Sequence, residues 1–303
     1  MSAGEPSADF RAGFVSLVGR PNAGKSTLTN AMVGNKVAIT SARPQTTRRV
    51  IRGIVNRPGG QVILVDTPGM HRPRTLLGER LNDLVRQTLS DVDLVALCLP
   101  AGEALGPGDR YLLGEITAAR TPVIAVVTKT DTVDDQTLAK HLVEVSTFAD
   151  FEEIVPVSAV TGDNVEHLAD LLVTKMEPSP PLYPEGEASD EPEHIVVAEL
   201  IREAALEGVR DELPHSIAVL VEEMNERTTK KGPIIDIYAD LYVERSSQKG
   251  IIIGHRGSRL KEVGRKARLE IERMLGAKVF LSLHVRVAKE WQRDPKALRR
   301  LGF

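Results

Sequence analysis

Residues 19–26 of this 303-residue chain have the residue types and spacing of a loop that holds phosphate groups. Glycines let successive backbone N–H groups turn toward one anion, and Lys25 adds positive charge. Ser26 offers a hydroxyl that can ligate Mg²⁺ at the start of a helix. The alternative is a glycine-rich turn without a ligand. The predicted nucleoside triphosphate contacts are Gly19, Arg20, Pro21, Asn22, Ala23, Gly24, Lys25, Ser26 and Thr27.

A second group of residues could complete a metal and phosphate site. Asp66 can hold Mg²⁺ through water, and Gly69 offers a backbone N–H to a terminal phosphate. A threonine between positions 44 and 48 could add a hydroxyl ligand, with Thr46 and Thr47 as alternatives, although such a stretch is often an ordinary loop. The predicted phosphate contacts here are Asp66, Thr67, Pro68 and Gly69, and the predicted metal ligands are Ser26, Thr47 and Asp66.

A third group can read a purine base. The carboxylate of Asp131 can accept hydrogen bonds from N1–H and the 2-amino group of guanine, a donor pair that adenine lacks. Lys129 can lie along the ring, and the backbone N–H of Ala159 can reach O6. Guanine is therefore the predicted base, and the predicted contacts are Thr128, Lys129, Asp131, Ser158 and Ala159.

The phosphate, metal and base residues all follow the ends of apolar runs. The strands that these runs predict must therefore position them. The runs over 14–18, 62–65, 123–127 and 154–157 predict strands, and the apolar spacing from Lys25 onward predicts a helix. A buried strand is also predicted over 92–99, where Cys98, the single cysteine, is more typical of a core residue than of a nucleophile.

The order GRPNAGKS, QTTR, DTPG, TKTD, SA resembles the translation-factor-like branch of the P-loop GTPases over residues 13 to about 176. The resemblance implies a Ras-like α/β domain with a mixed, mostly parallel sheet flanked by helices, which turns GTP and water into GDP and phosphate with Mg²⁺. Thr128 replaces the asparagine that is usual in this motif. The hydrogen bond that the asparagine makes to the nucleotide and the phosphate loop is therefore expected to be weaker or to be made differently. Met70 replaces the water-orienting glutamine of Ras-like enzymes.

Hydrolysis without that glutamine needs another route. The resemblance to GTPases with G-x-x-N-x-G-K-S implies a K⁺ ion held by Asn22 that neutralises charge on the transferred phosphoryl. The alternative is that Asn22 only fixes the turn of the loop. The residues expected to act in catalysis are Lys25, Thr47, Asp66, Gly69 and Asn22.

Residues 177–193 contain five prolines and six acidic residues, which favours an extended, solvated linker. The chain length also fits two domains. We therefore expect a GTPase domain over 10–176, a linker over 177–193 and a second domain over 194–303. No apolar run reaches the length of a membrane span, and the first residues lack a signal-peptide pattern, so we expect a cytoplasmic protein.

The second domain reads as a helix, two strands, two helices and a strand. The helix is expected over 197–206 and the strands over 216–223, 234–243 and 278–287, while a long helix ends near Leu275. The sequence Gly254-His255-Arg256-Gly257 joins the two central helices. A G-x-x-G sequence alone is a common turn.

Within I-I-I-G-x-x-G-x-x-L-K this turn resembles an α+β type II KH domain, which implies binding of about four unpaired bases. Ile251, Ile252 and Leu260 could line its groove or belong to the core. Trp291 could stack on a base or cap the domain. The predicted RNA contacts are Lys249, Gly254, His255, Arg256, Gly257, Ser258, Lys261 and Arg265.

Charge is unevenly distributed along the chain. From residue 241 onward there are 16 Lys and Arg against 6 Asp and Glu, about +10, whereas the whole chain carries −3. A charge run is often just a solvated face, but its position around the G-x-x-G turn favours a nucleic-acid surface.

The two domains together, ending in W-x-x-D-P-x-x-L-R-x-L-G-F, resemble the bacterial Era GTPases over nearly the whole chain. The resemblance implies binding to the 3′ end of 16S ribosomal RNA, a switch role in assembly of the 30S subunit, and room for peripheral contact with the inner face of the membrane. We expect a monomer. The competing classes are a metabolic kinase or ATPase, against which TKTD and SA argue, and an RNA-binding protein with an inactive nucleotide site.

Overall fold

The computed structural model describes residues 9–40, 46–70, 73, 75–207, 209, 216–229 and 232–303. The chain divides into two compact units. Most of the first two thirds of the chain forms unit 1, whereas unit 2 contains the remaining C-terminal part together with two short segments from the first third. Unit 1 comprises Met1–Thr40, Thr47–Arg72 and Leu81–Asp190, and unit 2 comprises Ser41–Thr46, Pro73–Arg80 and Glu191–Phe303.

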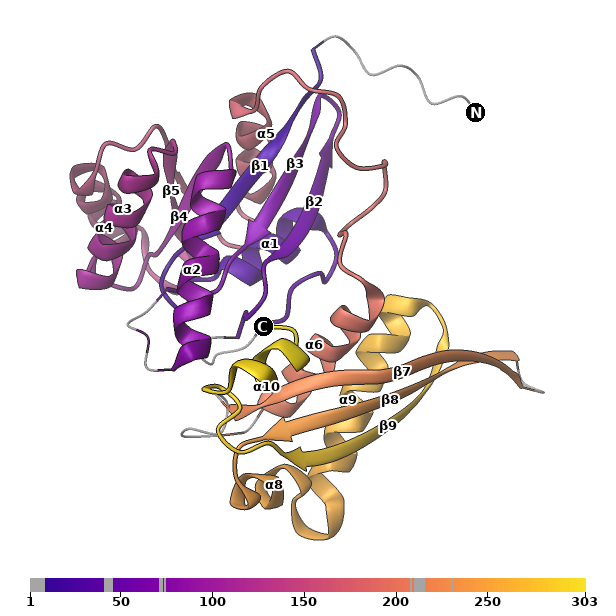
Figure 1. Cartoon of the computed structure of the whole chain (residues 1–303). Coiled ribbons are helices and arrows are strands. Elements are labelled where there is room, and N and C mark those ends of the chain that lie inside the picture. Colours follow the sequence, from indigo (N-terminus) through magenta and orange to yellow (C-terminus); the bar gives the residue numbers. More distant parts are fainter. Residues whose placement is uncertain are drawn as a thin grey trace. The chain divides into compact units, whose positions relative to one another are not determined.

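Unit 1 is built on a six-stranded sheet with the order β2-β3-β1-β4-β5-β6 (Figure 1). Only β2 is antiparallel to its neighbour, so the carboxyl ends of the other five strands share one edge. The strands are β1 (Arg11–Val18), β2 (Ile51–Arg57), β3 (Gly60–Asp66), β4 (Leu94–Pro100), β5 (Val123–Thr128) and β6 (Ile154–Pro156). The strands predicted from the apolar runs are therefore present.

Helices cover both faces of this sheet, because every central strand is apolar on both sides. Leu28 of α1 and Leu172 of α5 belong to the buried cluster on one face, and Val85 of α2 and Val145 of α4 belong to the cluster on the other. The helices are α1 (Lys25–Val33), α2 (Leu76–Asp91), α3 (Pro107–Ala119), α4 (Asp135–Phe148) and α5 (Val165–Lys175).

The acidic, proline-rich segment lies along the open edge of this sheet. The backbone N–H of Ile54 in β2 donates to the Ala188 carbonyl at 2.9 Å, and the Ser189 hydroxyl donates to the Arg52 carbonyl at 2.7 Å. Pairing an edge strand in this way protects it from other chains. The segment is extended and mostly exposed, as expected, but residues up to Asp190 are bound to unit 1.

Unit 2 contains a three-stranded sheet with the order β7-β8-β9, in which β7 is antiparallel and β9 parallel to β8. Apolar residues of α6 and α9 cover one face, for example Ile201, Ala267 and Ile271, which are fully buried. The order of elements agrees with that predicted from the sequence. The elements are α6 (Glu193–Leu206), β7 (Ala218–Thr229), β8 (Gly232–Val243), α8 (Ser246–Ile253), α9 (Ser258–Leu275), β9 (Lys278–Val287) and α10 (Pro295–Arg300).

Strand β7 extends to Thr229, six residues beyond the predicted end at Glu223. The prediction stopped where apolar residues stop alternating. Backbone pairing with β8 continues to Gly232, because a strand can be held by its ladder after its side chains leave the core.

The C-terminal segment is part of the core of unit 2. Trp291 is fully buried, its indole N–H donates to the Ser216 carbonyl at 3.0 Å, and its ring stacks on Phe303 with centroids 5.8 Å apart. Of the two roles considered for Trp291, the structure therefore supports capping. No helix in the described part of the chain combines the length and the apolar character needed to cross a membrane.

Candidate functional site

The phosphate loop connects β1 to α1 and requires glycine at two positions. A Cβ at Gly19 would lie 2.8 Å from the Cys98 carbonyl oxygen, so this backbone packs directly on β4. Gly24 has a φ of 89°, in the left-handed region that favours glycine. Asn22 also has a positive φ, 64°, which an asparagine tolerates.

Lys25 begins α1 and lies inside the loop. Its amine donates to the carbonyls of Gly19 at 3.1 Å and of Arg20 at 3.2 Å. Burial lowers the pKa of Lys25, while the carboxylate of Asp66 opposes that shift. A buried cation beside the backbone N–H groups of a loop is suited to a phosphate anion.

Three oxygen-bearing side chains meet at the start of α1. The Ser26 hydroxyl lies 2.6 Å from Asp66 Oδ2 and 3.0 Å from the Thr47 hydroxyl, and Thr47 donates to the same carboxylate oxygen at 3.4 Å. Asp66 is fully buried, and its Oδ1 atom has no hydrogen-bond partner in the protein. Burial raises its pKa. Hard oxygen ligands around an unsatisfied buried carboxylate oxygen fit Mg²⁺, and Thr47 rather than Thr46 supplies the nearby hydroxyl.

The residues after Asp66 have different roles. The Thr67 hydroxyl donates to the Leu17 carbonyl at 2.9 Å, which ties β3 to β1. A Cβ at Gly69 would lie 3.0 Å from the nitrogen of Pro21, so the backbone of Gly69 directly contacts the phosphate loop. Met70 is buried in the apolar cluster, so its side chain cannot orient a water molecule.

The predicted base-reading residues surround a cavity of about 170 Å³ lined by Thr128, Lys129, Asp131 and Ala159, among others. The Ser158 hydroxyl donates to Asp131 Oδ1 at 2.6 Å. The Asp131 side chain is exposed in the protein alone. Desolvation of its carboxylate would have to come from the base that covers it.

Two residues missed in the sequence hold this site together. Asp109 is fully buried, accepts from Arg20 Nε at 2.9 Å and from the Gly106 N–H at 2.8 Å, and so caps α3. Glu103 lies 3.1 Å from Arg20 and 4.0 Å from the Lys129 amine. The only sequence signal was their place just after the buried strand β4. Arg20 is thus directed toward α3 by two carboxylates.

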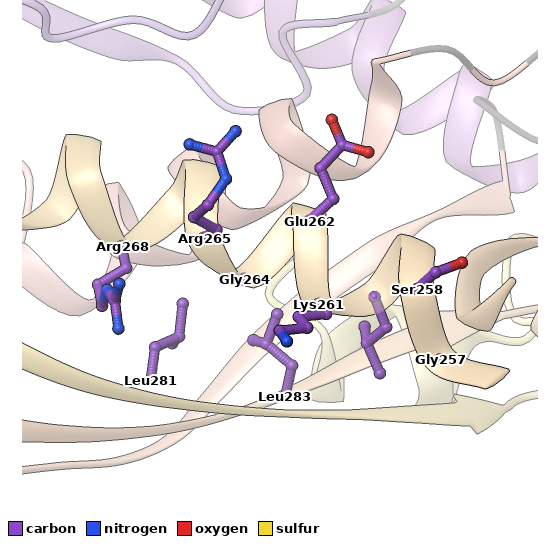
Figure 2. A pocket seen from close by; sticks show the side chains of 10 residues that line it. Gly257, Ser258, Lys261, Glu262, Gly264, Arg265, Arg268, Leu281 and Leu283 are labelled. Carbon is purple, nitrogen blue, oxygen red and sulfur yellow. The ribbon is translucent and has the colours of Figure 1, made fainter.

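Unit 2 contains a groove of about 710 Å³ between α9 and β9. Figure 2 shows Leu281 and Leu283 pointing from β9 toward α9, with Lys261 and Arg268 on the side of the helix that faces the strand. An apolar floor between cations suits unpaired bases attached to phosphates. The lining residues are Gly257, Ser258, Leu260, Lys261, Glu262, Gly264, Arg265, Arg268, Leu281 and Leu283.

Four of the eight predicted RNA contacts line this groove, namely Gly257, Ser258, Lys261 and Arg265. The other four, which are Lys249, Gly254, His255 and Arg256, lie outside its lining. His255 and Arg256 are exposed in the turn between α8 and α9.

The apolar residues of that region take three different positions. Leu260 lines the groove, Ile252 is fully buried, and Ile251 is 52% exposed but outside the lining. Leu281 and Leu283 were not identified because alternation in a strand does not tell which neighbour covers its apolar face.

Two family models match the chain. The model described as a 50S ribosome-binding GTPase matches residues 14–129, and the model described as a KH domain matches residues 212–292.

The chain is similar to known proteins over nearly its whole length. It is 62% identical over 301 residues to the GTPase Era of Streptomyces coelicolor, covering 97% of this chain and 95% of that protein. A crystal structure of an Aquifex aeolicus Era variant bound to GDP·AlF₄⁻ has a TM-score of 0.91 and 35% identity, covering 96% of this chain and 99% of that one. A crystal structure of Era with MgGDPNP and nucleotides 1506–1542 of 16S ribosomal RNA has a TM-score of 0.92 and 35% identity, covering 97% and 99%.

Proposed function

This chain belongs to the Era family of GTPases, and on that premise we propose that its GTP site controls RNA binding by its KH domain. The observation that carries the proposal is the presence in one chain of two sites. The first is formed by the buried side chains of Lys25 and Asp66 with the half-buried Ser26, and the second is the cationic groove along α9. We retain the division into a GTPase domain over 10–176, a linker over 177–193 and an RNA-binding domain over 194–303.

In the hydrolysis step, the chain's own groups hold the phosphates. Lys25 exchanges its bonds to loop carbonyls for the outer phosphates, and the Gly69 N–H donates to the terminal one. Ser26, Thr47 and Asp66 are the residues that would hold Mg²⁺, and the ion would supply positive charge to the phosphoryl oxygens. Because Asp109 and Glu103 hold the guanidinium of Arg20, we expect this residue to contact the phosphates through its backbone and not through its side chain.

We further propose that K⁺ supplies additional charge through Asn22, since Met70 is buried and no glutamine follows Gly69. The left-handed backbone of Asn22 shows that the residue is also suited to the turn itself. Turnover measured at equal Na⁺ and K⁺ concentrations decides between these roles. Faster hydrolysis in K⁺ that is lost in Asn22→Ala supports the proposal, and equal rates contradict it.

Guanine recognition rests on Asp131 and Ala159. The Ser158 hydroxyl occupies one oxygen of Asp131 and orients the carboxylate toward the cavity in which the base would lie. Adenine has no donor pair for this carboxylate, so we expect ADP to compete with GDP at least about 10⁴-fold less well.

The ligand of the groove is proposed to be the 3′ region of 16S ribosomal RNA, because the similar Era structure contains nucleotides 1506–1542 of that RNA. The cations of α9 fit the phosphates, and Leu260, Leu281 and Leu283 fit the bases. From this we propose a role in maturation of that RNA and in assembly of the 30S subunit, by a monomer in the cytoplasm that can also contact the membrane surface.

RNA crosslinking with sequencing tests this assignment in a cell lysate. The variant should reverse the charge of the turn without disturbing its backbone. A Cβ at Gly254 would lie 2.7 Å from the Cβ of Arg259, so substitution of that glycine would distort the loop. His255→Asp/Arg256→Asp keeps both glycines and changes only exposed side chains.

We expect the wild type to enrich the 3′ end of 16S ribosomal RNA and the double variant to lose that enrichment while keeping its GTPase rate. The matched control is Gln136→Asp/Lys140→Asp, which makes the same change of charge at exposed positions of α4 in unit 1. An even distribution over RNAs in the wild type would contradict the assignment.

A further inference from the structure

In the base site of this chain, the hydroxyl of Thr128 already donates a hydrogen bond within the protein. Thr128 is the last residue of β5 and lines the cavity together with Lys129 and Asp131. It is buried, and its hydroxyl donates to the Ala23 carbonyl in the phosphate loop at 2.7 Å. A carbonyl oxygen can only accept, so the direction of this bond is fixed.

A hydroxyl has one hydrogen, so Thr128 can donate one hydrogen bond and no more. Moving that hydrogen to a ligand would leave the carbonyl of Ala23, a fully buried residue, without this donor. Leaving a buried acceptor unsatisfied costs more than an exposed bond returns. Thr128 therefore holds the phosphate loop and has no hydrogen left for a base.

Guanine presents two neighbouring acceptors on one edge, O6 and N7. In the proposed site the Ala159 N–H takes O6 and Asp131 takes the N1–H and the 2-amino group, so N7 needs a further donor. Among the side chains that the structure describes around the cavity, Asp131 can only accept, the Thr132 hydroxyl donates to the Lys129 carbonyl at 2.8 Å, and the Lys129 amine faces Glu103. Thr27 also lines the cavity, but it belongs to the first turn of α1 next to the metal ligand Ser26, so we assign its hydroxyl to the phosphate end of the nucleotide.

We propose that this site binds guanine nucleotides without reading the N7 atom, because Thr128 gives its only hydrogen to Ala23. The site would accept 7-deazaguanine nucleotides as well as guanine nucleotides. The inference rests on the proposed function, in which this cavity holds the guanine base. An asparagine at position 128 has two amide hydrogens and could serve Ala23 and N7 together.

The experiment measures the dissociation constants of GDP and 7-deaza-GDP by calorimetry for the purified full chain and for two variants. In the wild type we expect a ratio of the two constants within about twofold of one. Thr128→Asn should bind GDP more tightly than 7-deaza-GDP by about three- to tenfold, the value of one neutral hydrogen bond. Thr128→Val removes the bond to Ala23 and should weaken both nucleotides equally.

A wild-type ratio above about five would overturn the inference, because N7 would then have a donor in this site. A ratio near one in Thr128→Asn would also overturn it, since N7 would then lie outside the reach of position 128. A chain that bound neither nucleotide would overturn the proposed function and this inference with it. The ratio of the GDP and 7-deaza-GDP constants in the wild type tests the inference by itself, so the test does not depend on whether Thr128→Val folds.

Discussion

Cys98 lies behind the phosphate loop, where its carbonyl faces Gly19. Burial raises the pKa of its thiol from an ordinary 9.0 to about 12, with Asp66 adding to the shift and Lys25 opposing it. At pH 8 its thiolate population is therefore about 1000-fold below that of a free cysteine. We predict that a disulfide reagent modifies Cys98 only after denaturant is added, and that GDP slows the reaction further. Rapid modification of the native protein would contradict this burial.

Asp66 is the residue on which the metal site depends. Replacing it by Asn keeps the shape but removes the charge that attracts Mg²⁺. We predict that Asp66→Asn loses the effect of Mg²⁺ on GTP affinity and hydrolyses GTP at least about 100-fold more slowly. Asp170→Asn, an exposed position on α5, is the control and should behave as the wild type. A variant that still responds to EDTA would place the metal elsewhere.

At the scale of elements, one glutamine fixes the course of the proline-rich segment. Gln61 in β3 is buried and makes four hydrogen bonds. Its amide donates to Asn56 and to the Tyr183 carbonyl, and its oxygen accepts from the N–H groups of Leu182 and Tyr183. The side chain of Gln61 thus pairs with the backbone groups of this segment as a neighbouring strand would pair with an edge strand.

We predict that Gln61→Ala lowers the free energy of unfolding by roughly 2–4 kcal/mol, because backbone groups of Leu182 and Tyr183 lose their partner. Limited proteolysis should then cut between residues 177 and 190 faster than in the wild type. Asn56→Ala removes a single bond and should have a small effect in both measurements. Equal proteolysis of Gln61→Ala and the wild type would contradict this role.

The bounds of some strands can be predicted from the sequence, whereas contacts between distant side chains cannot. Strand β9 was predicted with its observed bounds, Lys278–Val287, since periodicity is a local property. Asp109 and Glu103 were missed because their function comes from meeting Arg20, about 85 residues earlier in the chain. Gln61 was missed for the same reason. Contacts between distant segments depend on packing, which no local pattern records.

At the scale of the whole molecule, the chain passes between the two units five times, and one of these passages lies between Thr46 and Thr47. Within unit 2, Arg202 of α6 donates to the Thr46 carbonyl and is held by Glu199 through bonds of 3.0 and 2.6 Å. Also within unit 2, Arg80 donates to the Phe303 carbonyl at 2.8 Å. The residue next to a predicted metal ligand is therefore bound by a helix of the RNA-binding unit.

We predict that RNA affinity differs between the complexes with a GTP analogue and with GDP, and that Arg202→Ala removes most of this difference. Fluorescence anisotropy with a labelled 16S 3′-end RNA measures both affinities. Glu199→Gln/Arg202→Met removes both buried charges and should give the same result without leaving one carboxylate unpaired. Arg227→Ala, an exposed change on β7, is the control. Equal affinities in the wild type would remove the proposed switch.

The single tryptophan, Trp291, is enclosed within unit 2, and the chain contains no other indole. Emission excited at the red edge of the absorption band therefore comes from this unit alone, while circular dichroism sums the helices of both. Comparing the two signals during one thermal scan would reveal whether the units melt together or in succession. Because Trp291 lies C-terminal to the proline-rich segment, its fluorescence reports on unit 2 without an added label.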